Sequence, residues 1–154
     1  MKILRAAMLL PVLWIAAAIP ASAEEAPRVE QSVYVPAYSH VYQGPKSRIF
    51  DLAILLSIRN VDRSTPITIS LVEYYDDHGN KVRDFLEEPI VLQPLETFEV
   101  KIPEKNTDGG SGANFIVDWE AAHRITEPII QAVMIGAASQ QGISFVCDGV
   151  PLED

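Results

Sequence analysis

The sequence predicts an all-β fold, an immunoglobulin-like antiparallel β-sandwich of about seven or eight strands with at most one short helix. Apolar and polar residues alternate with a period of two over most of the chain beyond residue 31. Turn-forming residues separate these runs, and a helical pattern occurs at residues 119–128. The Cys…Trp…Cys pattern of antibody domains is absent, because the chain has one cysteine.

The N-terminus has the pattern of a cleaved secretory signal peptide, residues 1–23. Lys2 and Arg5 precede an apolar run at residues 6–19, and an A-x-A site at residues 21–23 follows it. The alternative, a membrane anchor, needs about 20 apolar residues, and this run is shorter. We therefore expect a bacterial periplasmic or secreted protein with no stable membrane insertion after cleavage.

Cleavage would leave a flexible mature N-terminus at residues 24–30 and one β-sandwich domain at residues 31–154. The full chain has a net charge of −9, and losing two basic residues with the signal gives 10 − 21 = −11. Such acidity argues against nucleic acid as a partner, because phosphate contacts require basic patches. Cys147 has no second cysteine to pair with. It is interpreted as a buried inert thiol, with an intermolecular bridge or a reactive thiol as alternatives.

The first alternating run, residues 33–42, has an aliphatic and an aromatic face. The aliphatic face comprises Val33, Val35, Ala37 and Val41. The aromatic face comprises Tyr34, Tyr38, His40 and Tyr42. Pro36 cannot donate a ladder hydrogen bond, so it marks an edge strand or a bulge. The aromatic face either contacts a partner or packs in the core.

The middle of the chain continues the alternation. Residues 48–60 are predicted to form one long strand with an apolar face of Phe50, Leu52, Ile54, Leu56 and Ile58. A hairpin turning at Gly79 follows, and its first strand directs Ile67, Ile69 and Leu71 inward. The next strand has Phe98, Val100 and Ile102 inward.

The remaining elements are a short strand, a helical segment and two strands. Residues 115–119 alternate, which places Trp119 in the core with Phe115 and Val117. Residues 119–128 suggest one or two helical turns stopped by Pro128. Residues 129–137 are apolar on both faces, which indicates a central strand, and residues 142–147 close the set.

Six segments carry a family resemblance over about residues 31–149. They are VYVPAYSHVY, LSIRN, YYDDHGNKVRDFL, GGSGANFIVDW, PIIQAVMIG and QGISFVCDG. Together they resemble the domain of unknown function family numbered 3124 (DUF3124), which comprises small secreted bacterial proteins. The resemblance implies a single exported domain and no assigned activity, cofactor or catalytic residue. Cys147 departs from it, since a small or polar residue is expected there.

The glycine-rich stretch NTDGGSGANFIVDW, residues 106–119, is the strongest candidate for a ligand loop. It lacks the lysine and the following helix of a phosphate loop, so nucleotide binding is not expected. Hard oxygen donors are present at Asn106, Asp108, Ser111, Asn114 and Asp118. Of these, Asp108, Asn114 and Asp118 are weak calcium candidates, because the spacing differs from an EF-hand. The alternative is a tight turn closed by its own side chains.

The sequence contains no readable set of nucleophile, base and orienting group, and no histidine pair with metal-ligand spacing. We therefore expect an exported non-catalytic binding module without a cofactor, whose partner is another envelope protein. The expected contact residues are Tyr34, Tyr38, His40, Tyr42, Asp108, Ser111 and Asn114. The alternative is a calcium- or glycan-binding β-sandwich that uses the Asp108–Asn114 loop.

Overall fold

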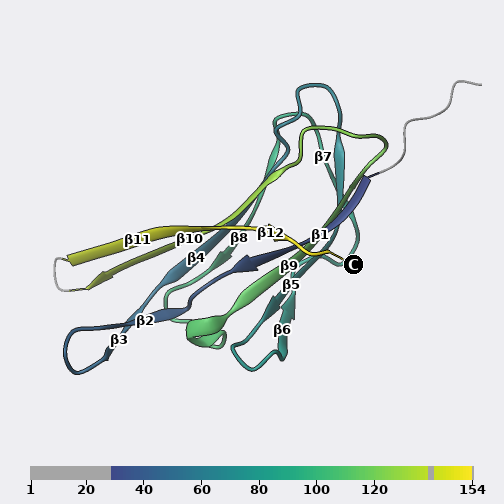
Figure 1. The fold of residues 1–154 in the computed structure, drawn as a ribbon. Coiled ribbons are helices and arrows are strands. Elements are labelled where there is room, and N and C mark those ends of the chain that lie inside the picture. Colours follow the sequence, from purple (N-terminus) through teal and green to yellow (C-terminus); the bar gives the residue numbers. More distant parts are fainter. Residues whose placement is uncertain (1–28, 139–140, 154) are drawn as a thin grey trace, which may run out of the picture.

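Strands that lie next to each other in a sheet pair antiparallel. The structure is a computed structural model that describes residues 29–138 and 141–153. The predicted all-β sandwich is confirmed (Figure 1). The larger sheet has the order β12 (Val150–Pro151), β1 (Val29–Pro36), β9 (Asn114–Ala121), β5 (Ile67–Tyr75) and β6 (Lys81–Asp84), and β7 (Ile90–Leu92) also pairs with β5. The second sheet has the order β11 (Gln141–Asp148), β10 (Ile129–Ala138), β4 (Ala53–Arg59) and β8 (Thr97–Ile102).

A separate two-stranded hairpin is formed by β2 (His40–Gln43) and β3 (Arg48–Asp51). It extends from the same side of the molecule as the β10–β11 hairpin (Figure 1). The two hairpins touch, because Phe50 and the Asp51 carbonyl lie against Gly136. The structure also contains a single-turn 3-10 helix, η1 (Gly110–Gly112).

The described residues form twelve strands, more than the seven or eight expected. Two runs break where the chain changes sheets, and the short strands β7 and β12 add two more. Residues 37–39 separate β1 from β2, and Leu52 separates β3 from β4. Backbone hydrogen bonds fix both breaks: Ser39 N donates to Gly110 O at 3.0 Å, and Leu52 N donates to Ser39 O at 2.9 Å. The chain thereby leaves one ladder without losing its hydrogen bonds.

The N-terminal segment and the segment at residues 119–128 differ from the prediction. The predicted signal peptide, residues 1–23, lies outside the described residues. Strand β1 begins at Val29, where Val29 opposes Ala121 and Glu30 opposes Glu120. Residues 29–30 of the expected flexible segment are therefore in a strand, and residues 24–28 lie outside the described residues. The helix expected at residues 119–128 is absent, because Trp119 continues the β9 ladder against Gln31 and Ile69. None of the described helices could span a membrane.

The core lies between the two sheets and follows the predicted alternation closely. Its largest fully buried side chains are Trp119, Tyr74, Phe115, Leu52, Ile54, Leu56, Ile58, Ile67, Ile69, Met134, Val35 and Val72. Leu71 was expected inside and is only half-buried. A bulge between Ile69 and Leu71 shifts the pairing with β9, so Val72 and Tyr74 turn inward instead.

Strand β10 is central, as predicted, since it lies between β11 and β4. Its two faces differ, however. Ile130, Ala132 and Met134 are buried, whereas Ile129 and Ile135 are 43% and 51% exposed on the outer face. The apolar run at residues 129–137 therefore correctly indicates a central strand, but its outer face is exposed to solvent.

Candidate functional site

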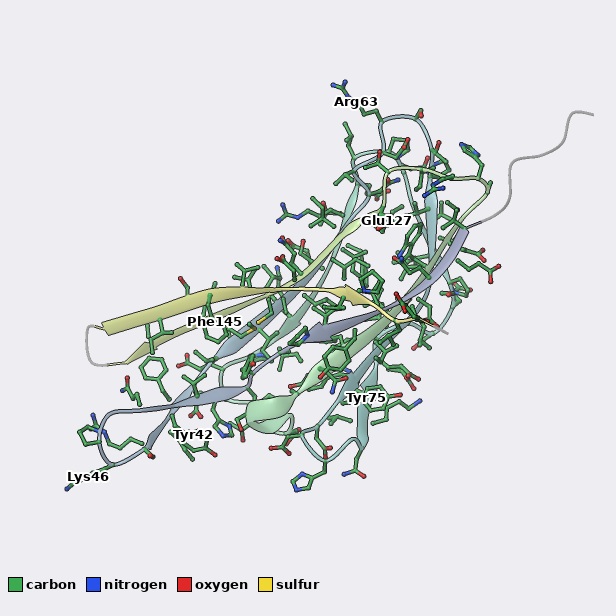
Figure 2. The ribbon with its side chains drawn as sticks, viewed as in Figure 1. Tyr42, Lys46, Arg63, Tyr75, Glu127 and Phe145 are labelled. Atoms are coloured by element: carbon green, nitrogen blue, oxygen red, sulfur yellow. The ribbon has the colours of Figure 1, made fainter. Side chains whose placement is uncertain are left out.

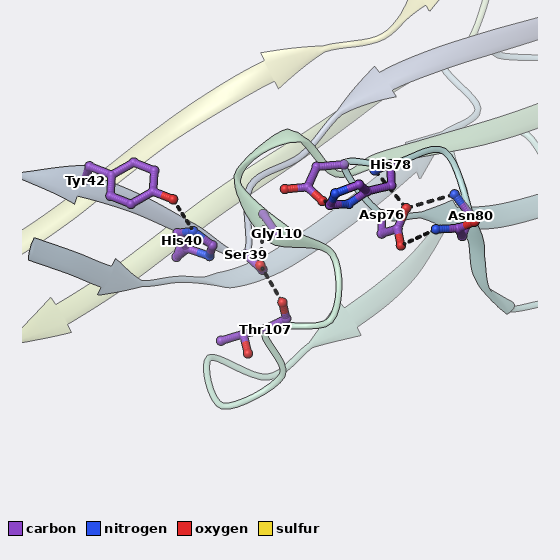
Figure 3. Close-up of polar contacts among 9 residues, drawn as sticks. Ser39, His40, Tyr42, Asp76, His78, Asn80, Thr107 and Gly110 are labelled. Atoms are coloured by element: carbon purple, nitrogen blue, oxygen red, sulfur yellow. Dashed lines mark hydrogen bonds and ion pairs between the residues drawn. The ribbon is translucent and has the colours of Figure 1, made fainter. Parts of the chain in front are cut away.

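The glycine-rich loop lies at the end of the sandwich where β5 turns into β6 and β1 passes into β2. Gly110 O accepts hydrogen bonds from Ser39 N and from Ser39 Oγ at 2.9 Å (Figure 3). Gly109 O accepts from Asp77 N at 3.1 Å, and Gly110 N donates to Thr107 O. The loop backbone therefore ties together two turns that are distant in sequence.

The glycines allow this close approach. A Cβ added at Gly109 would overlap the Tyr74 hydroxyl and lie 2.6 Å from Tyr74 Cζ. Gly110 has φ +73°, and a Cβ there would overlap the Asp77 carboxylate. A Cβ added at Gly112 would lie 3.1 Å from the Cβ of Asp77. Small residues are thus needed for packing and for backbone conformation.

Tyr74 lies beneath this loop and is 2% exposed. Its ring packs on Phe115 with the centroids 4.8 Å apart. Its hydroxyl has no hydrogen-bond partner among the described residues. Burial, and then the charge of Asp108, raises the pKa of Tyr74 to about 12. The hydroxyl is therefore a neutral buried group that contributes a packing surface at an energetic cost.

The structure places Asp108, Ser111 and Asn114 at this end but assigns them different surroundings. Asp108 is exposed, and its N–H donates to Asn106 Oδ1 at 3.2 Å. Ser111 lies in η1, and Asn114 begins β9 opposite Pro36 and Tyr75. The Asn106 side chain thus closes part of the loop.

Asp118 does not join these residues, which corrects the proposed calcium set. It lies four residues beyond Asn114 on the same strand, about 13 Å away at the usual rise per residue. Asp118 Oδ1 instead accepts a hydrogen bond from Ser32 Oγ at 2.6 Å on the outer face of the larger sheet. A single ion cannot be bound by both residues, because calcium–oxygen distances are about 2.3–2.6 Å.

A group of two aspartates and a histidine lies beside the loop. Ligand atoms of Asp76, Asp77 and His78 lie within 4.8 Å of one another, and Asp77 Oδ1 is 2.7 Å from His78 Nδ1. The Asp76 carboxylate accepts hydrogen bonds from Asn80 Nδ2, Asn80 N and His78 N (Figure 3). These bonds, chiefly those from Asn80, lower the pKa of Asp76. Its oxygens close the turn around Gly79.

The aromatic face of residues 33–42 does not form one surface. Tyr34 lies in the larger sheet between Ile116 and Val150, and Tyr38 packs edge-on against Phe145 with the centroids 5.6 Å apart. Of the aliphatic face, Val33, Val35 and Ala37 are buried. Of the aromatic face, Tyr38 packs against the core and Tyr42 is exposed. Strand β1 is also not a bare edge, because β12 pairs with it at Tyr34 and its neighbour.

His40 and Tyr42 occupy the outer face of the β2–β3 hairpin. Tyr42 lies directly opposite Ile49, and the two side chains are 59% and 61% exposed. His40 Nε2 and Tyr42 Oη hydrogen-bond at 3.3 Å, and the rings meet edge-on with the centroids 5.3 Å apart. Figure 2 shows Tyr42 on this hairpin, whose turn carries Lys46. The prediction of residues 48–60 as one long strand does not identify Ile49, because its pairing with Tyr42 depends on the hairpin register.

The opposite face of the hairpin anchors it to the sandwich. Phe50 is 3% exposed, and Val41 opposes it in the ladder and packs on the core. The exposed pair is therefore presented by a hairpin whose other face is fixed. Such a pair resembles the contact surfaces of protein interfaces, in which aromatic residues are enriched.

Cys147 is half-buried on the inner face of β11, packed against the core. Burial, and then the charge of Asp148, raises the pKa of the Cys147 thiol. A raised pKa lowers the thiolate fraction and hence the reactivity. This environment favours the interpretation of Cys147 as a small hydrophobic residue.

Comparison with known proteins identifies the family. The family model described as "Protein of unknown function (DUF3124)" matches residues 30–152, so the chain belongs to this family. A search of curated proteins finds no match. A crystal structure of Thermotoga maritima 1070 is similar over 78% of this chain and 92% of that chain, with 9% identity and a TM-score of 0.46. A likeness at this level carries no argument about function.

Proposed function

We propose that this member of the DUF3124 family is an exported, non-catalytic binding module of the bacterial envelope, and that the β2–β3 hairpin carries its protein-contact surface. The observation that supports the proposal is the cross-strand pair of Tyr42 and Ile49, each more than half exposed. A large apolar pair on a fixed hairpin is costly to leave in water and gains free energy when a partner covers it.

The chemistry of the pair defines the partner. The Tyr42 ring offers apolar area, and its hydroxyl, already oriented by His40, offers a polar tip. The neighbouring cross-strand pair, His40 and Asp51, adds polar groups at the margin. This pattern of an apolar centre with a polar rim fits an envelope protein with a shallow apolar depression.

The export part of the proposal depends on the signal-peptide pattern of residues 1–23. The non-catalytic part is supported by how the nearby hydroxyls are used. Ser39 is fully buried and bonds the loop carbonyls, and Ser32 donates to Asp118. The buried Ser39 side chain therefore serves the fold and is not exposed to solvent.

The calcium or glycan alternative has weaker support. It uses the Asp108–Asn114 loop, and the third calcium candidate, Asp118, lies four residues further along β9 than Asn114. Glycines could bring a ligand close to the loop backbone, but the Tyr74 and Asp77 side chains already occupy the space beside Gly109 and Gly110. A thermal-shift titration with calcium, with chelator as control, would restore this alternative if the melting temperature rose with calcium and the rise was lost in Asp108→Ala.

The proposal is tested by site-specific photocrosslinking in cells. A photoreactive phenylalanine analogue at position 42 is expected to give a discrete adduct with an envelope protein. The matched control places the same analogue at Val91, which is similarly exposed at 54% but lies on β7 of the larger sheet. Equal adducts at both positions, or none at position 42, would contradict the proposal.

A quantitative test follows once the adduct is identified. The double substitution Tyr42→Ala with Ile49→Ala is expected to weaken binding of the purified partner by about tenfold or more, the scale of a buried hot spot. Val91→Ala is the control and should leave the affinity unchanged.

A further inference from the structure

Strand β11 is the outermost strand of the four-stranded sheet. Over the described residues, its ladder partner is β10, and no strand pairs with its other side. It is eight residues long, whereas β6, at an edge of the larger sheet, has four. Figure 1 shows β11 running along the margin of the molecule. A long edge strand offers a row of backbone donors and acceptors to another strand.

The hydrogen-bond pattern shows which residues form this row. Gly149 N donates to Ile130 O at 2.8 Å, and the pair continues the register in which Asp148 opposes Gln131. Bonded and non-bonded pairs alternate along an antiparallel ladder, so the odd-numbered residues of β11 bond to β10. The N–H and C=O groups of the even-numbered residues therefore face the open edge. These residues are Gly142, Ser144, Val146 and Asp148.

Three other edge strands carry features that oppose pairing: β6 and β8 carry charged residues, and β12 is two residues long and contains Pro151. Strand β6 carries Lys81, Arg83 and Asp84, and β8 carries Glu99 and Lys101. Charges of this kind on an edge oppose pairing with another chain. Strand β11 has no lysine, arginine or proline. Its one charged residue, Asp148, is at its end, where Oδ1 accepts a hydrogen bond from Gln131 at 2.7 Å.

We propose that β11 pairs antiparallel with β11 of a second copy of this chain, with the two-fold axis at Phe145. In this register Ser144 exchanges hydrogen bonds with the partner's Val146, and Gly142 with the partner's Asp148. All four open residues of both strands are then bonded. The geometry forms one continuous eight-stranded sheet from the two four-stranded sheets.

The charges along β11 allow a second copy to bind in this register. The chain is strongly acidic, with a net charge of −9, so most of its surface repels another copy. Along β11 the register places Asp148 opposite the partner's Gly142, so no two carboxylates face each other. Edge pairing buries less area than a standard interface of about 1,600 Å², so we expect a dimer that dissociates on dilution. This inference does not depend on the β2–β3 contact surface.

The first test measures the oligomeric state of the chain, produced from its full-length gene and purified as the host processes it. Sedimentation velocity over a concentration series should show a monomer–dimer equilibrium. Ser144→Pro removes an N–H that faces the open edge and leaves the bonds to β10 intact. It is expected to raise the dissociation constant by about tenfold or more, since each copy loses an intermolecular donor.

The matched control is Glu99→Pro on β8. Asn60 N donates to Glu96 O, so the same alternation directs the Glu99 N–H to the open edge of β8. This variant should dimerise like the parent chain. If Ser144→Pro fails to fold, Val146→Lys, which places a lysine on the open edge, is used in its place. A chain that is monomeric at every concentration, or a folded edge variant that still dimerises fully, would overturn the proposal.

The register is tested with the native Cys147. In the proposed dimer Cys147 opposes the partner's Ile143 in a non-hydrogen-bonded pair, with Cα atoms about 4.5 Å apart, which suits a disulfide. Ile143→Cys should therefore give an oxidised covalent dimer on a non-reducing gel. Ile49→Cys, on the β2–β3 hairpin, should give none. The absence of a dimer in Ile143→Cys, or equal yields from the two variants, would reject this register.

Discussion

The glycine-rich loop and the β2–β3 hairpin use their residues in opposite ways. The loop has the composition of a ligand site, yet the Tyr74 and Asp77 side chains occupy the space beside its glycines. The hairpin has an ordinary alternating sequence, yet it leaves Tyr42 and Ile49 more than half exposed. The two regions therefore differ in which side chains they leave exposed, and residue type alone does not show this difference.

The difference arises from what each backbone must satisfy. The loop carbonyls bond to Ser39 and to the Asp77 N–H, so the loop is an internal joint between two turns. The hairpin satisfies its own backbone bonds through the β2–β3 ladder and packs through one face. Its second face is left for solvent or for a partner.

The largest effect expected in the loop tests its internal role. Gly109→Ala should lower the free energy of unfolding by about 3 kcal/mol, because the new Cβ overlaps the Tyr74 hydroxyl. Tyr74→Phe alone should raise it by about 1 kcal/mol, since it removes a buried hydroxyl without a partner. Urea denaturation of both variants and of the double variant measures these values.

The double variant supplies the control for that prediction. If the overlap is the cause, Tyr74→Phe should restore part of the stability lost in Gly109→Ala, beyond its own gain. Strict additivity of the two changes would show that the loop does not press on the hydroxyl, and the comparison between the two regions would fail.

A smaller effect separates packing from backbone conformation. Gly79 and Gly110 both have positive φ, at 80° and 73°, but a Cβ at Gly79 meets no atom within 4 Å. Gly79→Ala should therefore cost about 1 kcal/mol from the left-handed conformation alone. Gly110→Ala should cost about 2 kcal/mol, because it also presses on Asp77. Equal losses in thermal denaturation would mean that Asp77 moves aside without cost.

The sequence predicted the buried faces well because they depend on local alternation. The inward sides of β4, β8 and β9 were all identified, including Trp119, now 1% exposed. The errors came from long-range events. The bulge after Ile69 turned Leu71 outward, and the breaks at residues 37–39 and at Leu52 depend on bonds to segments far away in the sequence.

The candidate site was predicted less well, for the same reason. Asp108, Ser111 and Asn114 do lie at one end of the sandwich, but Asp118 does not, because strand rise separates it from them. Ile49 became a candidate only when the register placed it opposite Tyr42. The cross-strand partner of a residue depends on how the hairpin folds, and a period-two pattern does not encode it.

The loop at the opposite end of the sandwich extends the comparison through pH. Asp62 Oδ1 accepts hydrogen bonds from Ser64 N and Thr65 N, both at 2.9 Å, and these bonds lower the pKa of Asp62 to about 2 from an ordinary 3.8. The stability they contribute is present above the ordinary pKa and is lost as the pH falls towards 2. Asp62→Asn should therefore melt below the parent chain at pH 6, with the gap closing by pH 2. A gap that persisted at pH 2 would mean that the charge of Asp62 is not what holds this loop.

The smallest expected effect is the most informative about the hairpin. If Tyr42 and Ile49 serve a partner and not the fold, replacing both with alanine should change the free energy of unfolding by less than about 0.5 kcal/mol, as at other exposed positions. Phe50 is next to Ile49 on β3 but on its buried face. Phe50→Ala should lower the free energy of unfolding by about 3–4 kcal/mol, since it leaves a cavity in the core. Thermal denaturation of the two variants side by side measures both faces of one hairpin. A large loss from the exposed pair would assign it to folding, and the hairpin would then resemble the loop, with side chains already used within the molecule.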